Sequence, residues 1–278
     1  MMEPPHIVQA CVPKNPRRPV HNPQISVVVP VFRNAATLEE LARRLRAVLT
    51  PHGLMYELIL VDDASPDDSL AVTCRLVEKD PAVGVVLLAK NIGQHQAVWA
   101  GLRYARAPWI VVMDADLQDP PEEVPRLLET AKQGYDVVFA GRRGRYQPSW
   151  RMFTSRLFKT VLHVLTGVPR DAGMFLLMSR RMQQALIEHP VKEPFIPAMI
   201  GLSRLRICSV PVTRSVRPAG NSSYSDRDRL RLGLQALWGV VRWRTRGYPA
   251  LSGGPVADTP VRTVLGVCQI ATGARSWD

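Results

Sequence analysis

Short apolar runs recur along the first half of the chain, and a segment with helical periodicity separates each run from the next. The runs are residues 25–31, 57–61, 83–88, 109–113 and 136–140. Runs of this length that are rich in β-branched residues indicate strands buried on both faces. Strands that alternate with helices predict an α/β fold, with a mostly parallel central sheet and helices on both faces.

Acidic residues stand where two of these runs end. Asp62 and Asp63 follow the second run, and Asp114 and Asp116 follow the fourth. Carboxyl ends of parallel strands share one edge of a sheet, which is where open α/β sheets bind ligands. Residues two apart point to one side of an extended chain, and carboxylate oxygens suit Mg²⁺ or Mn²⁺, which in turn holds a diphosphate. For Asp62 and Asp63 we favour contact with a ribose or a base.

An acidic turn has a simpler interpretation, because Asp-x-Asp alone is a weak pattern. The acids after the fourth run would then only precede the helix that begins at Pro120-Pro121-Glu122-Glu123. No Gly-rich phosphate loop and no Cys-x-x-Cys pair is present, so neither a P-loop, a Rossmann cofactor domain nor a zinc site is supported. For His95, a surface or helix-packing role is favoured over catalysis.

The formal net charge of +12 predicts an anionic partner, which is a nucleic acid, a phosphorylated substrate or a membrane surface. Residues 141–170 combine basic and apolar helical faces, which suits phosphate or membrane contact, with a merely solvated face as the alternative. No stretch reaches the ~18 to 20 apolar residues of a membrane span. We therefore expect a cytoplasmic protein that is peripheral on the inner face of the cell membrane.

The predicted organisation has four parts. Residues 1–24 form a disordered Pro-rich leader, 25–225 the catalytic domain, 226–248 a basic amphipathic helix and 249–278 a flexible tail. Trp238 and Trp243 beside arginines fit a membrane interface, and a helix docked on the domain core fits them equally well.

The ordered set of motifs resembles family 2 glycosyltransferases of the GT-A fold, in particular the dolichyl- or polyprenyl-phosphate mannose or glucose synthases. The matching strings are Val29-Pro30-Val31-Phe32-Arg33-Asn34, Val61-Asp62-Asp63-Ala64-Ser65-Pro66-Asp67, Asn91-Ile92-Gly93, Met113-Asp114-Ala115-Asp116-Leu117-Gln118-Asp119-Pro120-Pro121-Glu122, Gly141-Arg142-Arg143, Arg151 with Ser155, Asp171-Ala172-Gly173-Met174-Phe175 and Arg217-Pro218-Ala219-Gly220-Asn221-Ser222-Ser223-Tyr224. The resemblance covers about residues 25–246. Ser223 stands where the family commonly has a lysine.

The resemblance implies a role for each matched residue. Pro30 and Asp62 would line the nucleotide pocket, with Asp63 in support. Asp114, Asp116 and Gln118 would hold Mg²⁺ or Mn²⁺ on the diphosphate. The phosphates of donor or acceptor would meet Arg142 or Arg143, Arg151, Ser155, Arg217 and Ser222. Asp116, Arg151 and Asp171 would act in the reaction itself, Asp171 as the candidate base beside the acceptor.

The resulting hypothesis is inverting transfer of a hexose from GDP-mannose or a UDP-sugar to a polyprenyl phosphate. A lipid phosphate is already anionic and needs only to be oriented, whereas a soluble hydroxyl acceptor requires a general base. Both acceptors stay open at this point. A basic nucleic-acid-binding protein would explain the charge but not the acids at two strand ends, so no nucleic acid partner is expected. The sugar and the oligomeric state, a homo-oligomer included, are left open.

Overall fold

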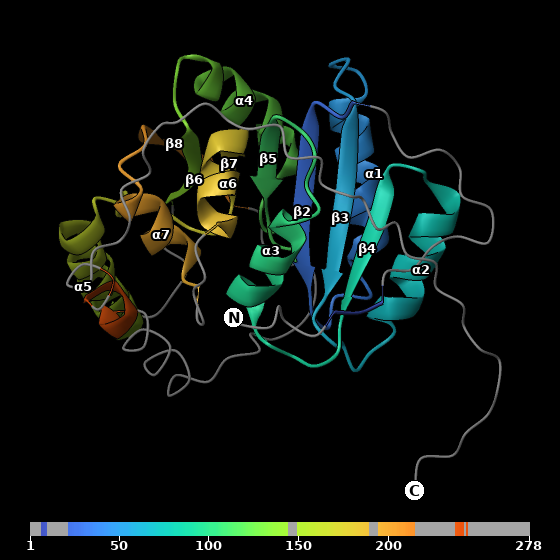
Figure 1. Ribbon diagram of the computed structural model, residues 1–278, viewed down its shortest axis with the longest axis horizontal. Coiled ribbons are helices and arrows are strands. Elements are labelled where there is room, and N and C mark those ends of the chain that lie inside the picture. The colour runs from blue at the N-terminus through green and yellow to red at the C-terminus, as the bar shows by residue number, and fades with distance from the viewer. Residues whose placement is uncertain are drawn as a thin grey trace, which may run out of the picture.

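A computed structural model describes residues 7–9, 22–143, 149–188, 194–214, 237–241 and 243 (Figure 1). Its strands are β1 (Ile7–Gln9), β2 (Ile25–Val31), β3 (Tyr56–Asp62), β4 (Val83–Leu88), β5 (Trp109–Val112), β6 (Val137–Arg143), β7 (Leu176–Ser179) and β8 (Ile207–Thr213). Its helices are α1 (Leu38–Leu49), α2 (Ser69–Lys79), α3 (Gln94–Leu102), the 3-10 turn η1 (Pro121–Glu123), α4 (Val124–Lys132), α5 (Ser149–Thr166), α6 (Arg180–Ile187) and α7 (Ile196–Leu202).

The strands of this described part form one sheet in the order β1-β4-β3-β2-β5-β7-β6-β8. Parallel pairing joins β2 to β3 and β5, β3 to β4, and β6 to β8. β7 is antiparallel to both β5 and β6, so β6 and β8 run in the same direction as β5. The carboxyl ends of β2, β3, β4, β5, β6 and β8 therefore lie at one edge, together with the amino end of β7. The predicted α/β sheet is confirmed.

Side chains alternate between the two faces of the sheet, and each face is covered by helices. In β2, Val27 and Val29 belong to a buried cluster that includes residues of α1, α2 and α4, whereas Val28 belongs to a cluster that includes residues of α3, α6 and α7. Figure 1 shows α3 and α6 in front of the sheet. A Cβ at Gly101 of α3 would overlap the side chains of Val28 and Val61, so the close approach of this helix to the sheet depends on glycine.

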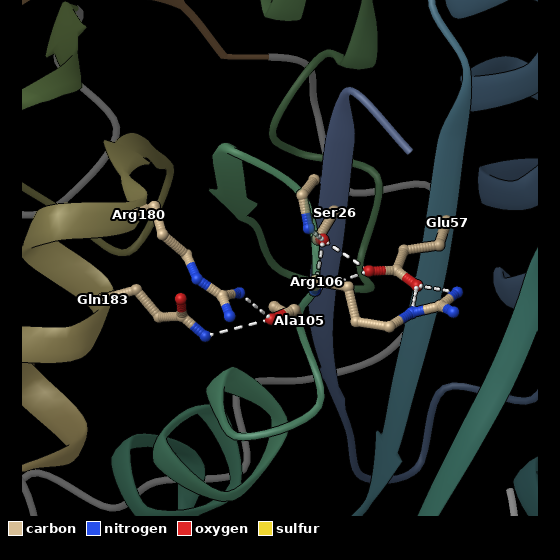
Figure 2. Close-up of polar contacts among 7 residues, drawn as sticks. Ser26, Glu57, Ala105, Arg106, Arg180 and Gln183 are labelled. Atoms are coloured by element: carbon tan, nitrogen blue, oxygen red, sulfur yellow. Dashed lines mark hydrogen bonds and ion pairs between the residues drawn. The ribbon is translucent and has the colours of Figure 1, made fainter. Parts of the chain in front are cut away.

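A buried polar network joins the amino ends of the central strands, at the edge opposite to the acidic residues. Figure 2 shows Glu57 between Ser26 and Arg106. Ser26 Oγ donates to Glu57 Oε1 at 2.6 Å, and Arg106 Nε and Nη2 lie 2.8 and 2.6 Å from Oε2. Arg180 Nη1 from α6 donates to the carbonyl of Ala105 at 2.6 Å. These contacts hold the α3–β5 connection against the sheet.

Three features differ from the expectations. Ile7–Gln9 pairs with β4 as a short antiparallel strand, within the segment that the sequence analysis expects to be a leader. β7 runs antiparallel to both of its neighbours in a sheet that was expected to be mostly parallel. The helix α7 was not expected from the sequence. Of the predicted helix 226–248, the described residues 237–241 and 243 are helical, with Val240 buried and Trp238 72% exposed.

Within the described ranges, every helix is too short or too polar to cross a lipid bilayer.

Candidate functional site

The loops that follow β2, β3 and β5 each contain a non-glycine residue in the left-handed conformation. These residues are Arg33, Ala64 and Leu117, with φ of 59°, 52° and 60°. Each such residue costs of the order of 1–3 kcal/mol and persists only where the surroundings impose it. Here the restraints include a hydrogen bond from Thr37 Oγ1 to the carbonyl of Ala115, at 2.7 Å. Backbone strain thus concentrates at the edge where the sequence predicts ligand binding.

Asp62, at the end of β3, is 4% exposed and has an unusual carboxylate. Its Oδ2 accepts a weak 3.4 Å hydrogen bond from the Ser65 N–H, and its Oδ1 is buried without a hydrogen-bond partner among the described residues. Burial raises the pKa of Asp62, because the ionised form loses its hydration. A buried acceptor without a partner is unfavourable, so this oxygen is available to a donor group on a ligand.

Pro30 lies next to this position in β2, where its register partner is Val61. The β2–β5 ladder ends two residues earlier, at Val28 and Val112, so the missing N–H of proline breaks no bond on that side. Pro30 is partly exposed and borders the edge that Asp62 faces.

Asp63 has a different task, because both of its oxygens have partners. They accept hydrogen bonds from the Ile92 and Gly93 N–H groups, at 2.7 and 2.9 Å. Burial raises the pKa of this carboxyl, and the two N–H donors oppose that effect. Asp63 therefore fixes the turn that begins α3. Gln94 follows Gly93 as the first residue of α3, and its side-chain amide donates to Asp114 Oδ1. The helix α3 therefore connects the loop after β3 with the loop after β5.

His95 packs rather than binds. Its ring meets Phe195 edge to face, with the centroids 4.7 Å apart. Burial lowers the pKa of His95 to about 4, so its ring is neutral at physiological pH. The predicted helix-packing role agrees with these contacts.

The loop after β5 brings two carboxylates and an amide oxygen to one guanidinium. Arg214 follows the last residue of β8, and its Nε and Nη2 lie 2.8 and 2.7 Å from Asp119 Oδ1. Arg214 Nη1 donates to Gln118 Oε1 at 3.0 Å, and Nη2 lies 3.6 Å from Asp114 Oδ2. Asp116 Oδ1 accepts from the Gln118 N–H at 3.1 Å. We call Asp114, Asp116, Gln118 and Asp119 the acidic cluster.

The acidic cluster suits a cation site in which the protein supplies only part of the ligands. No three His, Cys, Asp or Glu side chains in the described part of the chain are grouped so that they alone hold a metal. Mg²⁺ in phosphate-handling enzymes takes one or two carboxylates and completes its shell with substrate phosphates and water. Asp114 and Asp116 supply these hard oxygen ligands. The residues therefore fit a divalent cation that binds together with a diphosphate.

Asp171 lies at the same edge, just before β7. Its Oδ2 accepts a 2.8 Å hydrogen bond from Ser209 Oγ of β8. A Cβ at Gly141 of β6 would overlap both this oxygen and the serine hydroxyl. Gly141 thus makes room for Asp171, and Ser209 fixes its orientation.

The remaining predicted residues divide into two groups. β6 pairs Arg142 with Val212 and Arg143 with Thr213, which places both backbones beside the strand that leads to Arg214. Arg151 and Ser155 belong to α5, and the side chains of these four residues are not among those described. Arg217 and Ser222 lie outside the described residues.

Sequence reasoning missed Gln94, Asp119, Ser209 and Arg214. Arg214 could have been found, because it follows an expected strand and the same rule had identified the acids. No signal marked Ser209, whose role depends on the pairing of β6 with β8.

Taken together, the sheet order and the ligand edge define a GT-A glycosyltransferase domain. A mannosyltransferase from Pyrobaculum calidifontis, solved with GDP-mannose and Mn²⁺, superposes with a TM-score of 0.57 at 18% identity over 89% of this chain and 69% of that one. Glucosyl-3-phosphoglycerate synthase from Mycobacterium tuberculosis, solved with Mn²⁺ and UDP-glucose, gives 0.56 at 20% identity over 79% and 78%.

The chain belongs to glycosyl transferase family 2, whose model matches residues 26–196. It is similar to the undecaprenyl-phosphate 4-deoxy-4-formamido-L-arabinose transferase of Pseudomonas aeruginosa (strain LESB58), with 39% identity over 91% of this chain and 76% of that protein. The enzyme of the same name from Klebsiella pneumoniae (strain 342) is 37% identical over 73% and 63%.

Proposed function

We propose that the protein transfers a sugar from a nucleoside-diphosphate donor to a polyprenyl phosphate, with a divalent cation on the diphosphate. The observation that carries the proposal is the unpartnered, buried Oδ1 of Asp62, which shares one sheet edge with the acidic cluster. A nucleotide supplies hydroxyl or N–H donors for the first, and a metal-bound diphosphate matches the second.

The relatives support the acceptor and refine the sugar. Both curated relatives are named for undecaprenyl phosphate and for 4-deoxy-4-formamido-L-arabinose. The formamido-arabinose donor therefore takes precedence over the hexose donors expected from the sequence. The solved GT-A structures with GDP-mannose or UDP-glucose support Mn²⁺ as the first cation to test.

In the proposed reaction, an oxygen of the acceptor phosphate forms a bond to the anomeric carbon, while the bond from that carbon to the diphosphate breaks. The diphosphate leaves with the electron pair, and a bound divalent cation stabilises its negative charge. Asp62 holds the nucleoside, and Asp114 and Asp116 position the cation. Arg142, Arg143, Arg151, Ser155, Arg217 and Ser222 are the proposed contacts of the donor and acceptor phosphates.

Asp171 distinguishes two acceptor chemistries. A phosphate acceptor arrives ionised, so Asp171 need only orient it, whereas a hydroxyl acceptor must lose a proton to a base. The 2.8 Å contact with Ser209 holds the carboxylate for either task. Asp171→Asn retains most turnover in the first case and loses it in the second.

We place the protein at the inner face of the cell membrane, where its acceptor lipid lies. The basic face of the segment 141–170 would contact anionic headgroups there.

The test is a screen for release of nucleoside diphosphate with Mn²⁺ or Mg²⁺. UDP- and GDP-linked sugars, the formamido-arabinose donor included, are supplied with and without a short polyprenyl phosphate. Release that depends on the lipid phosphate supports the proposal and identifies the donor. Release that requires a soluble hydroxyl compound instead would contradict the proposed acceptor.

A further inference from the structure

We propose that Arg214 is an internal cation that neutralises the acidic cluster in the free enzyme and moves to the diphosphate when the metal-bound donor arrives. Binding of free divalent cation is then weak, and binding of the cation with a nucleoside diphosphate is strong. This inference rests on the proposed function, because it assumes that the acidic cluster receives a cation.

The geometry of Arg214 is that of a cation in a ligand shell. Its three guanidinium nitrogens meet Asp119, Gln118 and Asp114 at 2.7 to 3.6 Å. Two of these residues, Asp114 and Gln118, are ones that the sequence assigned to a metal. The arginine side chain is 15% exposed and that of Asp119 is 1% exposed, so solvent screens these contacts poorly.

Charge balance explains why an arginine stands there. Asp114, Asp116 and Asp119 bring three carboxylates into one short loop, where like charges repel one another in a partly desolvated setting. One guanidinium compensates for part of this charge. A divalent cation that enters the cluster meets the repulsion of Arg214, and must compete with it for the oxygens of Asp114 and Gln118.

Arg214 is able to exchange partners. The described β6–β8 pairing ends at Thr213, so the ladder does not extend to the Arg214 backbone. A guanidinium donates in a planar fork that matches phosphate as well as carboxylate. A diphosphate bound at the cluster therefore replaces the lost carboxylate contacts, whereas a free metal ion offers no replacement.

The test measures metal affinity rather than turnover. Binding of Mn²⁺ to the full-length protein is titrated by electron paramagnetic resonance, with and without UDP or GDP, in the wild type and in Arg214→Gln. We expect free Mn²⁺ to bind the variant about tenfold more tightly, which is within the usual range of coupling between two sites. In the presence of the nucleoside diphosphate, Mn²⁺ should bind the variant more weakly than the wild type.

Arg44→Gln is the matched control. Arg44 forms an ion pair with Glu122 at 2.6 Å, beside the acidic loop but outside the cluster. The Arg44→Gln substitution removes the same charge as Arg214→Gln, so the affinity of this control variant for free Mn²⁺ should match that of the wild type. Arg214→Lys keeps the charge and serves if the Gln variant does not fold, as circular dichroism will show. Lysine lacks the fork, so its affinity for free Mn²⁺ should lie between those of the wild type and Arg214→Gln.

If free Mn²⁺ binds Arg214→Gln and the wild type with equal affinity, the inference is overturned and the proposed function stays intact. If only Arg214→Lys folds, the same comparison is made with that variant. Tighter binding to the Gln variant both with and without nucleotide would overturn the transfer of Arg214 to the diphosphate. If neither the wild type nor any variant binds Mn²⁺ in the presence of a nucleoside diphosphate, the proposed metal-dependent function itself fails.

Discussion

Replacing Asp62 by asparagine should stabilise the free protein and weaken its hold on the donor. The wild-type carboxylate has a buried Oδ1 without a described partner and a weak 3.4 Å bond at Oδ2. An unsatisfied buried acceptor costs about 1–3 kcal/mol, and more when it is charged. Asparagine keeps the shape and removes the charge. We expect the free energy of unfolding at pH 7 to rise by about 1 kcal/mol, which is the lower end of that range.

The pH dependence has a definite sign. Burial raises the pKa of Asp62 in the folded protein, so folding holds its proton more tightly than the unfolded chain does. The wild type therefore loses stability as pH rises from the unfolded pKa, about 3.9, through the folded pKa. The advantage of Asp62→Asn is complete above the folded pKa and shrinks on acidification. Urea unfolding followed by circular dichroism at pH 4 and pH 7 measures it.

Donor affinity should change in the opposite direction. A hydrogen bond to a charged acceptor contributes about 1.5–3 kcal/mol, so calorimetric titration with the nucleoside diphosphate should show a loss of about 10- to 100-fold. Asp68→Asn is the matched control, since Asp68 is an exposed carboxylate in the same loop. Unchanged nucleotide affinity, or a less stable Asp62→Asn protein, would refute the reasoning.

Two further substitutions test the edges of the sheet separately. Gly141→Ala should displace the Asp171 carboxylate from Ser209 and lower the transfer rate by about tenfold to hundredfold, because small misplacements of reacting groups are costly. The measured kcat checks this, and an unchanged value means that Asp171 does not serve the reaction in this position. Glu57→Ala should lower the free energy of unfolding by about 3–5 kcal/mol in urea, because it removes the buried carboxylate that accepts from Ser26 and pairs with Arg106. At low temperature, where the Glu57→Ala protein remains folded, we also expect its kcat to stay near the wild-type value. A folded Glu57→Ala protein with a reduced kcat would contradict the view that this edge of the sheet serves stability and the opposite edge serves catalysis.

Local patterns predicted the regular part of the fold. The strand at Ile25–Val31 was expected with these bounds, because seven successive apolar or small residues followed by a polar turn have few other solutions. The sequence also placed four acids at one edge of the sheet, because they follow strands that were expected to be parallel. These acids are Asp62, Asp63, Asp114 and Asp116. The direct link through Gln94 was not foreseen, since a hydrogen bond between α3 and the loop after β5 depends on tertiary packing.

Non-local pairing accounts for the misses. β1 is only three residues long and depends on the β4 edge for its partner, so composition around it indicated disorder. The reversal of β7 decides where Asp171 lies, and a short apolar run does not encode direction. Arg214 follows an expected strand, which is a signal that the sequence contains, but its contact with the acidic cluster also depends on the sheet order that places β8.

The most direct test of the central claim is transfer of the donor sugar to a short polyprenyl phosphate, followed by mass spectrometry of the lipid product. The wild type, Asp116→Ala and Glu57→Gln are compared with Mn²⁺ and with EDTA, after circular dichroism shows each variant to be folded. We predict a glycosylated lipid phosphate from the wild type and from Glu57→Gln only with Mn²⁺, and none from Asp116→Ala. Product from folded Asp116→Ala at the wild-type rate, or equal product with EDTA, would contradict a cation held by the acidic cluster.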